Sequence, residues 1–371
     1  MLFVYQVSFG TFLGLGTWLT DYFTIFYDNV IIGYTSQFLE FIGIEGFAHG
    51  LVVDGILAGI GGVLVFLPQI VVLFFMLAIL EGTGYMARVA IVMDRFLSKF
   101  GFNGKSIVPI ITGFGCSVPA IMATRTIADK KERMLTILTI PFVSCSARLP
   151  LYGIFISVFF DKYRAPMILG LYILGILVML LSAKFLSLSY FKGSGSKFIL
   201  EVPQYRMPQL RTITYQALEK AKRFVKKAGT FILVGSIILW IFSNVGTTGI
   251  NISQEDSLLS VVAGFVAPIF YPLGFGNWQA TSSLISGFLA KEVIVSSLEI
   301  LYMGDISTGF STLQALTYVV FASLYVPCIS TVATIKSETG SAKWTIFSVI
   351  YPFVIAYSVA MIVRLIFMPF L

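Results

Sequence analysis

The 371-residue sequence has few charged residues, few cysteines and a single histidine. Charged residues make up 12% of the chain and hydrophobic residues 57%, and the mean hydropathy is +0.91. This composition excludes an ordinary soluble enzyme and predicts an integral membrane protein. No segment interleaves basic and aromatic residues as a nucleic-acid-binding surface would, so nucleic acid is not an expected partner.

The three cysteines, Cys116, Cys145 and Cys328, cannot form a disulfide framework, and all three lie in apolar segments. We therefore expect free thiols. The single histidine, His49, lies far along the chain from them, and neither a zinc-protease motif nor a pair of carboxylates is present, so an intramembrane enzyme is not expected. No basic residue precedes the first apolar stretch, which argues against a cleavable signal peptide.

Windows of roughly 20 apolar residues, enough to cross the hydrocarbon of a bilayer, recur along the chain. They lie near residues 2–19, 56–80, 134–159, 165–189, 229–246, 313–334 and 344–368. Two further apolar segments are interrupted, residues 106–126 by GFGCSVP and residues 277–301 by Lys291 and Glu292. Irregular backbone at membrane depth must be satisfied by protein, water or a ligand, so these interruptions indicate a transport site.

The charges of the loops predict the topology. Residues 84–105, 125–133 and 190–228 are rich in Lys and Arg and are expected inside, whereas residues 20–55, 247–276 and 302–312 carry acids without Lys or Arg and are expected outside. The segments flanking 106–126 can both be inside only if 106–126 is a re-entrant hairpin. The same argument makes 277–301 a hairpin that opens to the outside. The turn at Lys162 and Arg164 is an exception, because this scheme places it outside.

The sequence therefore predicts an all-α polytopic membrane protein with about seven spanning helices and two re-entrant hairpins. The order hairpin, span, span occurs twice with opposite orientation, which predicts an inverted repeat. The expected domains are residues 1–105 (N-terminal spans and an interfacial helix at 84–100), 106–189 (first gate repeat), 190–276 (basic cytoplasmic linker, one span and an outer loop) and 277–371 (second gate repeat, its span ending near 368). A rival register between the halves pairs SVPAI with YVPCI.

The expected repeat places unusual residues at corresponding positions. Cys116 lies in the first hairpin and Glu292 in the second, while Cys145 and Cys328 lie beside prolines in the spans that follow. Proline unwinds a helix, so carbonyl oxygens become available there as well as sulfur. Thiolate, carboxylate and carbonyl groups suit a divalent ion of borderline softness. The predicted metal ligands are Cys116, Cys145, Glu292 and Cys328.

Simpler interpretations of these residues stay open. The thiols are also interpretable as small buried apolar side chains. Glu292 is interpretable as half of a fixed ion pair with Lys291 or Arg148, rather than as a carboxylate available to the cation. A structural zinc site is disfavoured, because structural zinc cysteines usually come in close pairs.

Other polar residues near the apolar segments have local explanations. His49 could collect metal with Glu45 and Asp54, but a single histidine in a loop is more often a surface residue. Glu81 and Arg88 lie at the end of a span and at the start of the interfacial helix, where snorkelling or capping explains them. We place none of these residues in the site.

The alternation of apolar and basic residues over 212–228 predicts an amphipathic helix on the inner leaflet. Its apolar stripe is Ile213, Ala217, Ala221, Phe224 and Val225, and its basic residues are Lys220, Lys222, Arg223, Lys226 and Lys227. Docking of a cytoplasmic partner domain is the alternative. The GSGS sequence at 193–196 predicts a flexible linker between the repeats.

Several segments in order resemble the membrane domain of the ferrous iron transport protein B (FeoB) family over nearly the whole chain. They are GVLVFLPQI, LEGTGYMARVAIVMDR, GFGCSVPAIMATRT, ERMLT, PFVSCSARLPLY and the later AKE and VPC. The resemblance implies uptake of Fe²⁺, as the transported substrate, across the bacterial inner membrane. A more distant resemblance to concentrative nucleoside transporters implies the same layout of span, interfacial helix, hairpin and broken span.

Members of that family carry an N-terminal cytoplasmic G domain, which this sequence does not contain. The fragment Gly104, Lys105, Ser106 lacks the glycine that a phosphate-binding loop needs about five residues earlier, where Lys99 stands. We therefore expect GTP to act only through a separate or missing G domain.

The chain is expected to lie in a lipid bilayer. A separate G domain or a small cytoplasmic iron-transport protein is a candidate partner, and association with further copies of the chain as a homo-oligomer is left open. The alternative functions are transport of a nucleoside-like organic solute and a membrane assembly subunit that transports nothing.

Overall fold

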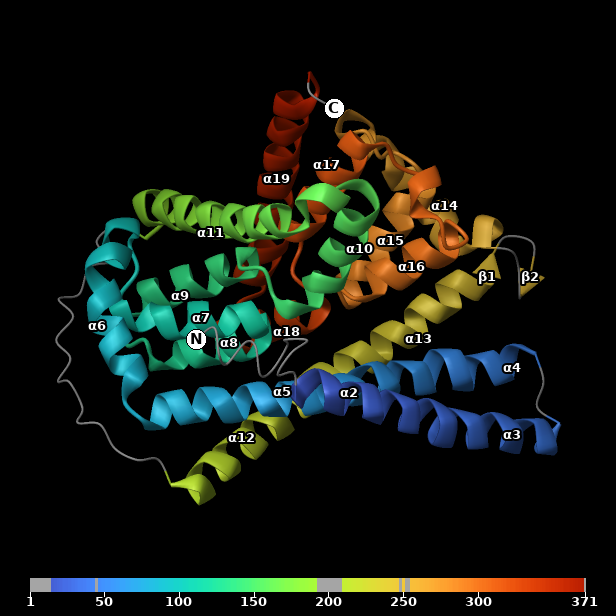
Figure 1. The fold of residues 1–371 in the computed structure, drawn as a ribbon, viewed down its shortest axis with the longest axis horizontal. Helices are drawn as coiled ribbons and strands as arrows, with labels where there is room; N and C mark the ends of the chain where they lie inside the picture. Colours follow the sequence, from blue (N-terminus) through green and yellow to red (C-terminus); the bar gives the residue numbers. More distant parts are fainter. Residues whose placement is uncertain (1–14, 44–45, 192–208, 247–248, 251–253, 370–371) are drawn as a thin grey trace. The chain divides into compact units, whose positions relative to one another are not determined.

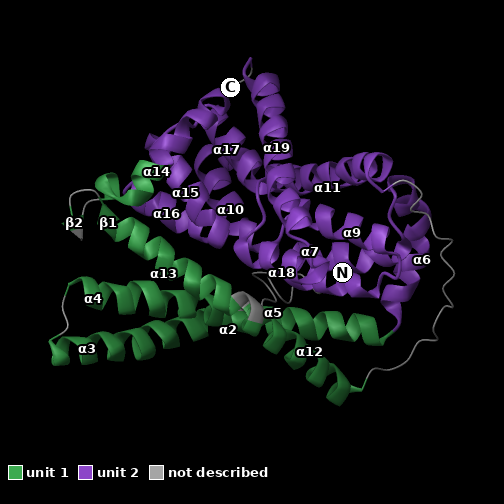
Figure 2. Cartoon of the chain, turned by 180° about the vertical axis from the view of Figure 1, so that it is seen from behind, with its two compact units in different colours: residues 1–83, 205–262 green, residues 84–204, 263–371 purple. Residues whose placement is uncertain are grey.

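The computed structural model describes residues 15–43, 46–191, 209–246, 249–250 and 254–369 (Figure 1). Nearly all of them are helical. A two-stranded antiparallel sheet joins β1 (Val245–Gly246) to β2 (Gly249–Ile250). The chain divides into two compact units, Met1–Thr83 with Tyr205–Val262 and Gly84–Gln204 with Ala263–Leu371 (Figure 2). The expected linker at 193–196 lies outside the described residues.

The first unit is organised around one long apolar helix. Its helices are α2 (Leu15–Phe26), α3 (Gly33–Ile42), α4 (Phe47–Gly50), α5 (Ala58–Gly82), α12 (Leu210–Phe224) and α13 (Thr230–Asn244), with π-helical segments before α3, α5 and α13. α5 packs against α2, α12 and α13. Apart from Gln69, its sequence is apolar all round until Glu81, so it can accept partners on several sides.

The apolar stripe of α12 packs on protein. Ile213, Ala217, Ala221 and Phe224 are buried, and α12 packs against α5. The helix is amphipathic as expected, but its apolar stripe is covered by the apolar helix α5 and not left for lipid. Its place at the inner leaflet stays a prediction.

The second unit contains two series of helices in the same order. The first series is α6 (Tyr85–Leu97), α7 (Ile107–Gly115), α8 (Ser117–Ala123), α9 (Lys130–Thr139), α10 (Leu149–Phe159) and α11 (Arg164–Ser189). α7 packs on α8, and α11 packs along α9 and α10. The interfacial helix expected at 84–100 corresponds to α6 and the short turn after it.

The second series is α14 (Leu258–Val266), α15 (Trp278–Leu289), α16 (Val293–Leu301), α17 (Thr312–Leu324), α18 (Ile329–Thr339) and α19 (Ala342–Phe367). The start of α14, up to Val262, belongs to the first unit. α15 packs on α16, and α19 packs on α17 and α18. Both series therefore contain a short helix pair, a broken apolar stretch and a long helix. α14 forms within residues 247–276, where the sequence indicated an outer loop.

Local sequence explains where the short helix pairs begin and break. Asn103 and Asn277 both have extended backbone, and each side chain accepts an N–H from the turn that follows. Cys116 follows Asn103 at the same spacing as Ala290 follows Asn277. Cys116 has φ −154° and ψ 134°, and Ala290 has φ −147° and ψ 133°. The two pairs are therefore built alike, and Cys116 and Ala290 occupy corresponding positions.

Within the residues that the structure describes, five stretches are long and apolar enough to cross a membrane, so the chain is a multi-pass membrane protein. They are Phe47–Gly82, Lys130–Phe159, Asp161–Ser189, Thr312–Thr339 and Ala342–Phe367. The pair Leu258–Leu273 and Trp278–Leu289, bent by 105°, raises the number to six if it is one span. α13 is a shorter apolar helix, and the window at 2–19 lies largely outside the described residues. The count of about seven spans and the re-entrant hairpins stay predictions.

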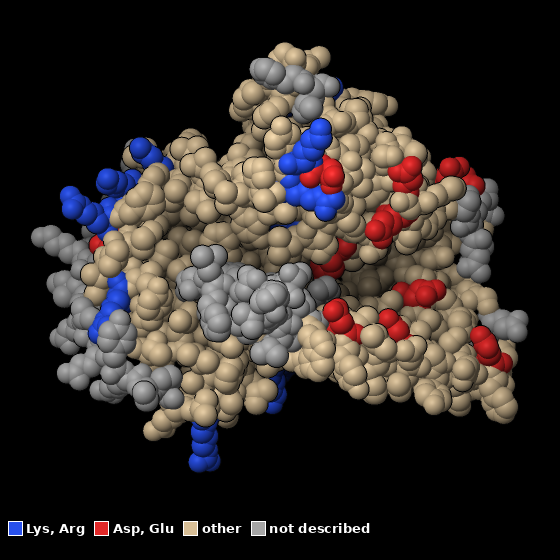
Figure 3. All heavy atoms as spheres, viewed as in Figure 1, with Lys and Arg blue, Asp and Glu red and all other residues tan. Residues whose placement is uncertain are grey.

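Charge is distributed unevenly over the second unit. On the face drawn in Figure 3, Lys and Arg gather over the α6 end of this unit, and Asp and Glu gather over the α14 to α16 end. A small group of both signs lies between them. This separation is the pattern that a basic inner side and an acidic outer side would give.

Candidate metal centre

Cys116 lies at the break between the two helices of the first pair. α7 ends at Gly115, α8 begins at Ser117, and the residue between them is extended. The Cys116 N–H donates to the Thr112 carbonyl at 3.1 Å, and the Ser146 hydroxyl donates to the Gly115 carbonyl at 2.9 Å. The half-buried thiol is therefore presented by an irregular backbone segment whose polar groups are hydrogen-bonded.

Cys145 lies in the break between α9 and α10. Residues 143–145 are not helical and separate the turn Ile140–Phe142 from the turn Ser146–Arg148. Arg148 is buried and reaches back across the break, where Nη1 donates to the Val143 carbonyl at 3.2 Å and Nη2 to the Pro141 carbonyl at 3.1 Å. The carbonyl oxygens freed by the break are thus held by a guanidinium group.

Cys328 lies in the break between α17 and α18, where its Sγ is 3.1 Å from the Thr331 hydroxyl. Two hydrogen bonds tie this break to the second short helix pair. The Tyr325 hydroxyl donates to the Leu284 carbonyl at 3.0 Å, and Lys291 Nζ donates to the Val326 carbonyl at 2.7 Å. Each broken stretch is therefore fastened to the helix pair that precedes it.

Glu292 stands immediately before α16 and makes no capping hydrogen bond with its side chain. In the described part of the chain it forms no ion pair within 4.0 Å. The two cations proposed as its partners, Lys291 and Arg148, donate to backbone carbonyls instead. The fixed ion pair is therefore not found among these residues.

The four predicted ligands lie in one region of the second unit but do not form one coordination shell. Cys116 is within electrostatic range of Cys145, Cys328 and Glu292. Among the residues that the structure describes, no three His, Cys, Asp or Glu side chains lie close enough to hold one metal ion. The three cysteines are free and half-buried. The ligand set therefore stays a prediction.

The other sequence candidates have local partners. His49 Nε2 lies 3.1 Å from the Ser36 hydroxyl, and Glu45, one of its two expected companions, lies outside the described residues. Glu81 pairs with Lys220 at 2.9 Å within the first unit. These contacts account for both groups without a metal.

Sequence reasoning missed Ser146 and Tyr325, two side chains that hold the breaks, and it assigned Arg148 a different role, as an ion-pair partner of Glu292. Ser146, Arg148 and Tyr325 each lie within three residues of a thiol that stands at a break. A hydrogen-bond donor close to a Pro- and Cys-containing interruption is a usable signal, because freed carbonyls need donors. The sequence does not say which carbonyl each donor reaches.

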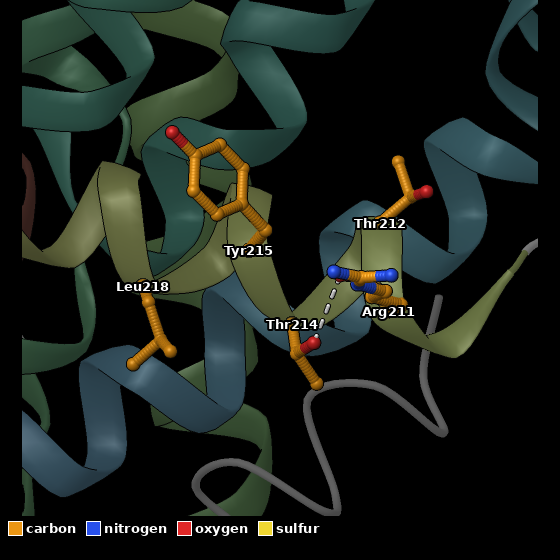
Figure 4. Close-up of a pocket in the computed structure, with 5 residues that line it drawn as sticks. All are labelled: Arg211, Thr212, Thr214, Tyr215 and Leu218. Carbon is orange, nitrogen blue, oxygen red and sulfur yellow. Dashed lines mark hydrogen bonds between the residues drawn. The ribbon is translucent and has the colours of Figure 1, made fainter.

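A separate pocket of about 450 Å³ lies on α12 in the first unit (Figure 4). Its described lining is Arg211, Thr212, Thr214, Tyr215 and Leu218. The Thr214 hydroxyl is used in a 3.0 Å hydrogen bond to the Arg211 carbonyl. These five residues supply neither a thiol nor a carboxylate, so they are unsuited to a soft or borderline metal ion.

Two family models match the chain. The gate family described as "Nucleoside recognition" matches residues 63–159 and 225–342, and the model described as "Ferrous iron transport protein B C terminus" matches residues 168–220. No solved structure matches the chain significantly.

Curated relatives match over most of the chain. The Fe(2+) transporter FeoB of Staphylococcus aureus (strain MSSA476) is 48% identical over 354 residues, which cover 94% of this chain and 53% of the relative. The Methanocaldococcus jannaschii protein of the same name is 41% identical over 350 residues, covering 90% and 52%. A Porphyromonas gingivalis Fe(2+) transport protein A/Fe(2+) transporter FeoB fusion protein is 34% identical, covering 98% and 49%. The chain thus spans about half the length of the curated relatives it matches.

Proposed function

Because the chain belongs to the ferrous iron transport protein B family and corresponds to its membrane domain, we propose that it carries Fe²⁺ across the membrane. In this proposal it is the permease part of an uptake system in the bacterial inner membrane. The names of the relatives, Fe(2+) transporter, support the substrate.

The observation that carries the proposal is the gathering of Cys116, Cys145, Cys328 and Glu292 at backbone breaks of one unit. Fe²⁺ accepts sulfur, carboxylate and carbonyl ligands. A permeating ion needs ligands that replace its water without holding it, which suits a few ligands spread over successive positions. Breaks in helices are where carbonyl oxygens join such a path.

We further infer that residues 106–189 and 277–368 form an inverted repeat with re-entrant hairpins at 106–126 and 277–301. The common order of helix pair, broken stretch and long helix supports this repeat. The shared Asn cap and the shared spacing to Cys116 and Ala290 favour the register that pairs these two residues over the register that pairs SVPAI with YVPCI.

The proposal includes partners outside this chain. We propose that GTP acts through a G domain that is separate from these 371 residues. A small cytoplasmic iron-transport protein is a second proposed partner, because a relative carries a transport protein A segment fused to its FeoB part. Self-association is a further proposal, and the chain itself is not proposed to be an enzyme.

The alternatives are less well supported. A nucleoside-like solute needs polar groups beside the first break, where Thr112 and Ser117 stand. The Thr112 hydroxyl is already donated to the Val108 carbonyl at 2.8 Å, which leaves Ser117 alone for such a solute. A non-transporting assembly subunit would tolerate substitution of Cys116 and Glu292.

The test is anaerobic uptake of radiolabelled Fe²⁺ into proteoliposomes that contain this chain alone or with a separately expressed G domain and GTP. Cys116→Ser and Glu292→Gln are expected to abolish saturable uptake at matched protein incorporation. Ser117→Ala and Glu299→Gln are the matched controls, because Ser117 adjoins the break and Glu299 is an exposed carboxylate on α16. Uptake that survives both site substitutions would overturn the proposed site. Absence of uptake both with and without the G domain and GTP would overturn the assignment of Fe²⁺ as the substrate.

A further inference from the structure

Three helices of the second unit each have one end at a cysteine. α8 begins directly after Cys116, α18 begins directly after Cys328, and α9 leads into the break that holds Cys145. α8 packs against α18 (Figure 1), and Cys116 is within electrostatic range of the other two thiols. The thiol ends of the three helices therefore lie near one another.

The opposite ends of the same helices are joined by charged side chains. Glu338 of α18 accepts hydrogen bonds from Arg125, in the turn after α8, at 2.8 and 2.6 Å and from Arg133 of α9 at 2.9 Å. We call these three residues the clamp. α18 has 11 residues, which at 1.5 Å per residue span about 16 Å, so the clamp lies well away from the thiol ends.

Apolar side chains lie between the thiols and the clamp. Ala120 and Ile121 of α8, Ile137 of α9, Ile140 directly after α9 and Ile335 of α18 form a cluster separate from the large core of the unit. Each of these side chains is at most 1% exposed. On all three helices the cluster lies between the thiol end and the clamp end.

We call this cluster the apolar plug, because its side chains supply no ligand for a cation. An ion that entered it would lose water without gaining oxygen, nitrogen or sulfur in return. Apolar constrictions of this kind stop ions by excluding water. The closely packed plug therefore bars a cation from moving from the thiols to the clamp.

The clamp is suited to a contact that opens and closes. The Glu338 side chain is 2% exposed, so its charge needs the arginines while it is buried. The Arg125 and Arg133 side chains are 52% and 30% exposed, so water is already near both of them when the clamp is closed. Apolar side chains would serve a permanent contact equally well, whereas charged groups can exchange their partner for water.

We propose that the apolar plug and the clamp form a closed inner gate of the transport path. For a divalent ion to pass from the thiols to the inner side, the Glu338 end of α18 separates from α8 and α9, which opens the plug to water. Arg125 and Arg133 bound the basic segment 125–133 that is expected inside, which places the clamp at the inner side. This inference rests on the proposed function and its topology.

The experiment measures the side from which the thiols are reached. The full chain is expressed in cells, and a membrane-impermeant maleimide is applied to inverted membrane vesicles, where it meets the inner face. Peptide mapping follows the alkylation of Cys116 and Cys328 over time. Glu338→Gln keeps the size of the side chain and removes its charge. We expect alkylation about tenfold faster than in the unchanged chain, the factor that a loss of about 1.4 kcal/mol from the closed state gives.

Arg125→Gln is an independent second variant that is less likely to unfold the chain, because the Arg125 side chain is 52% exposed. It is expected to accelerate alkylation in the same direction, whereas Arg125→Lys, which keeps the charge, is expected to stay slow. Glu219→Gln removes an ion pair within α12 and is the control. When the maleimide is applied to the outer face of intact cells, all of these variants are expected to react at the rate of the unchanged chain.

Unchanged rates in both Glu338→Gln and Arg125→Gln would overturn the inner gate. Equal acceleration from both faces would mean that the fold as a whole has loosened, and it would overturn the gate as well. Fe²⁺ uptake into proteoliposomes, measured in parallel, separates the gate from the proposed function. Acceleration confined to the inner face of a chain that takes up no Fe²⁺ would support the gate and overturn the proposed substrate.

Discussion

Arg125 holds Glu338 through two hydrogen bonds, although the residues are 213 positions apart. The Nε and Nη2 atoms of Arg125 donate to the two carboxylate oxygens at 2.8 and 2.6 Å, and Arg133 adds a third bond at 2.9 Å. The Glu338 side chain is 2% exposed and the Arg125 side chain 52%. One buried carboxylate thus joins the turn after α8, the first part of α9 and the end of α18.

We predict that Glu338→Gln destabilises the second unit by about 1–3 kcal/mol, because two arginines lose their buried partner. The loss is smaller than for a fully buried pair, since Arg125 is half exposed to solvent. Thermal unfolding of the purified chain in detergent, followed by size-exclusion chromatography, measures the effect. Glu219→Gln is the matched control, because Glu219 is 42% exposed and its ion pair with Arg223 lies within α12. Equal melting temperatures for the two variants would contradict this prediction.

Gly287 is predicted to tolerate no side chain. A Cβ atom there would clash with the buried Ile294 side chain and lie 2.6 Å from the Tyr325 hydroxyl. Gly287→Ala is expected to cost about 1–3 kcal/mol of stability by forcing α15 and α16 apart. Gly264→Ala in α14, where a Cβ would meet nothing within 4 Å, is expected to be neutral or slightly stabilising. Unfolding of both variants in the same detergent decides whether α15 and α16 pack as closely as described.

The proposed topology predicts opposite accessibility for two exposed lysines that flank the first broken stretch. Lys130 begins α9 and is expected inside, whereas Lys162 follows α10 and is expected outside. In a background without native cysteines, a membrane-impermeant maleimide should label Lys162→Cys in intact cells and Lys130→Cys only after permeabilisation. Labelling of both from the same side would mean that the broken stretch Lys130–Phe159 does not cross the membrane.

Metal binding is predicted to protect the thiols from alkylation. The chain has only three cysteines. The intact mass after maleimide treatment therefore gives the number of alkylated thiols, and peptide mapping shows which cysteines carry the label. Anaerobic Fe²⁺ should slow alkylation of Cys116 several-fold, whereas Mg²⁺, which prefers oxygen ligands, should not. Identical rates with the two ions would mean that the thiols are buried side chains without a ligand role.

Much of this architecture is readable from the sequence because its signals are local. Hydropathy windows locate the stretches Lys130–Phe159, Asp161–Ser189, Thr312–Thr339 and Ala342–Phe367 to within a few residues. Glycine and proline mark the interruption at Cys116, since those residues do not suit a continuous helix. The family resemblance likewise rests on short sequence motifs that follow one another in a fixed order along the chain.

Other structural features depend on which segments pack against each other in the fold. The amphipathic pattern of α12 indicates a face that is covered, but a lipid and the apolar α5 satisfy the same pattern equally well. The pairing of Lys291 with Glu292 was a reasonable expectation for neighbours in sequence. In the fold, the Val326 carbonyl comes within 2.7 Å of Lys291 and takes the hydrogen bond.

The sequence by itself determined the membrane class, the main apolar stretches and the positions of the backbone breaks, because composition and helix interruption act over a few neighbouring residues. Only the tertiary structure decided that Arg148 and Lys291 hold break carbonyls, that Tyr325 reaches Leu284, and that Glu338 collects two arginines. Each of these contacts joins groups whose partners depend on how the helices pack, and hydrogen bonds form with whichever acceptor the packing brings within reach.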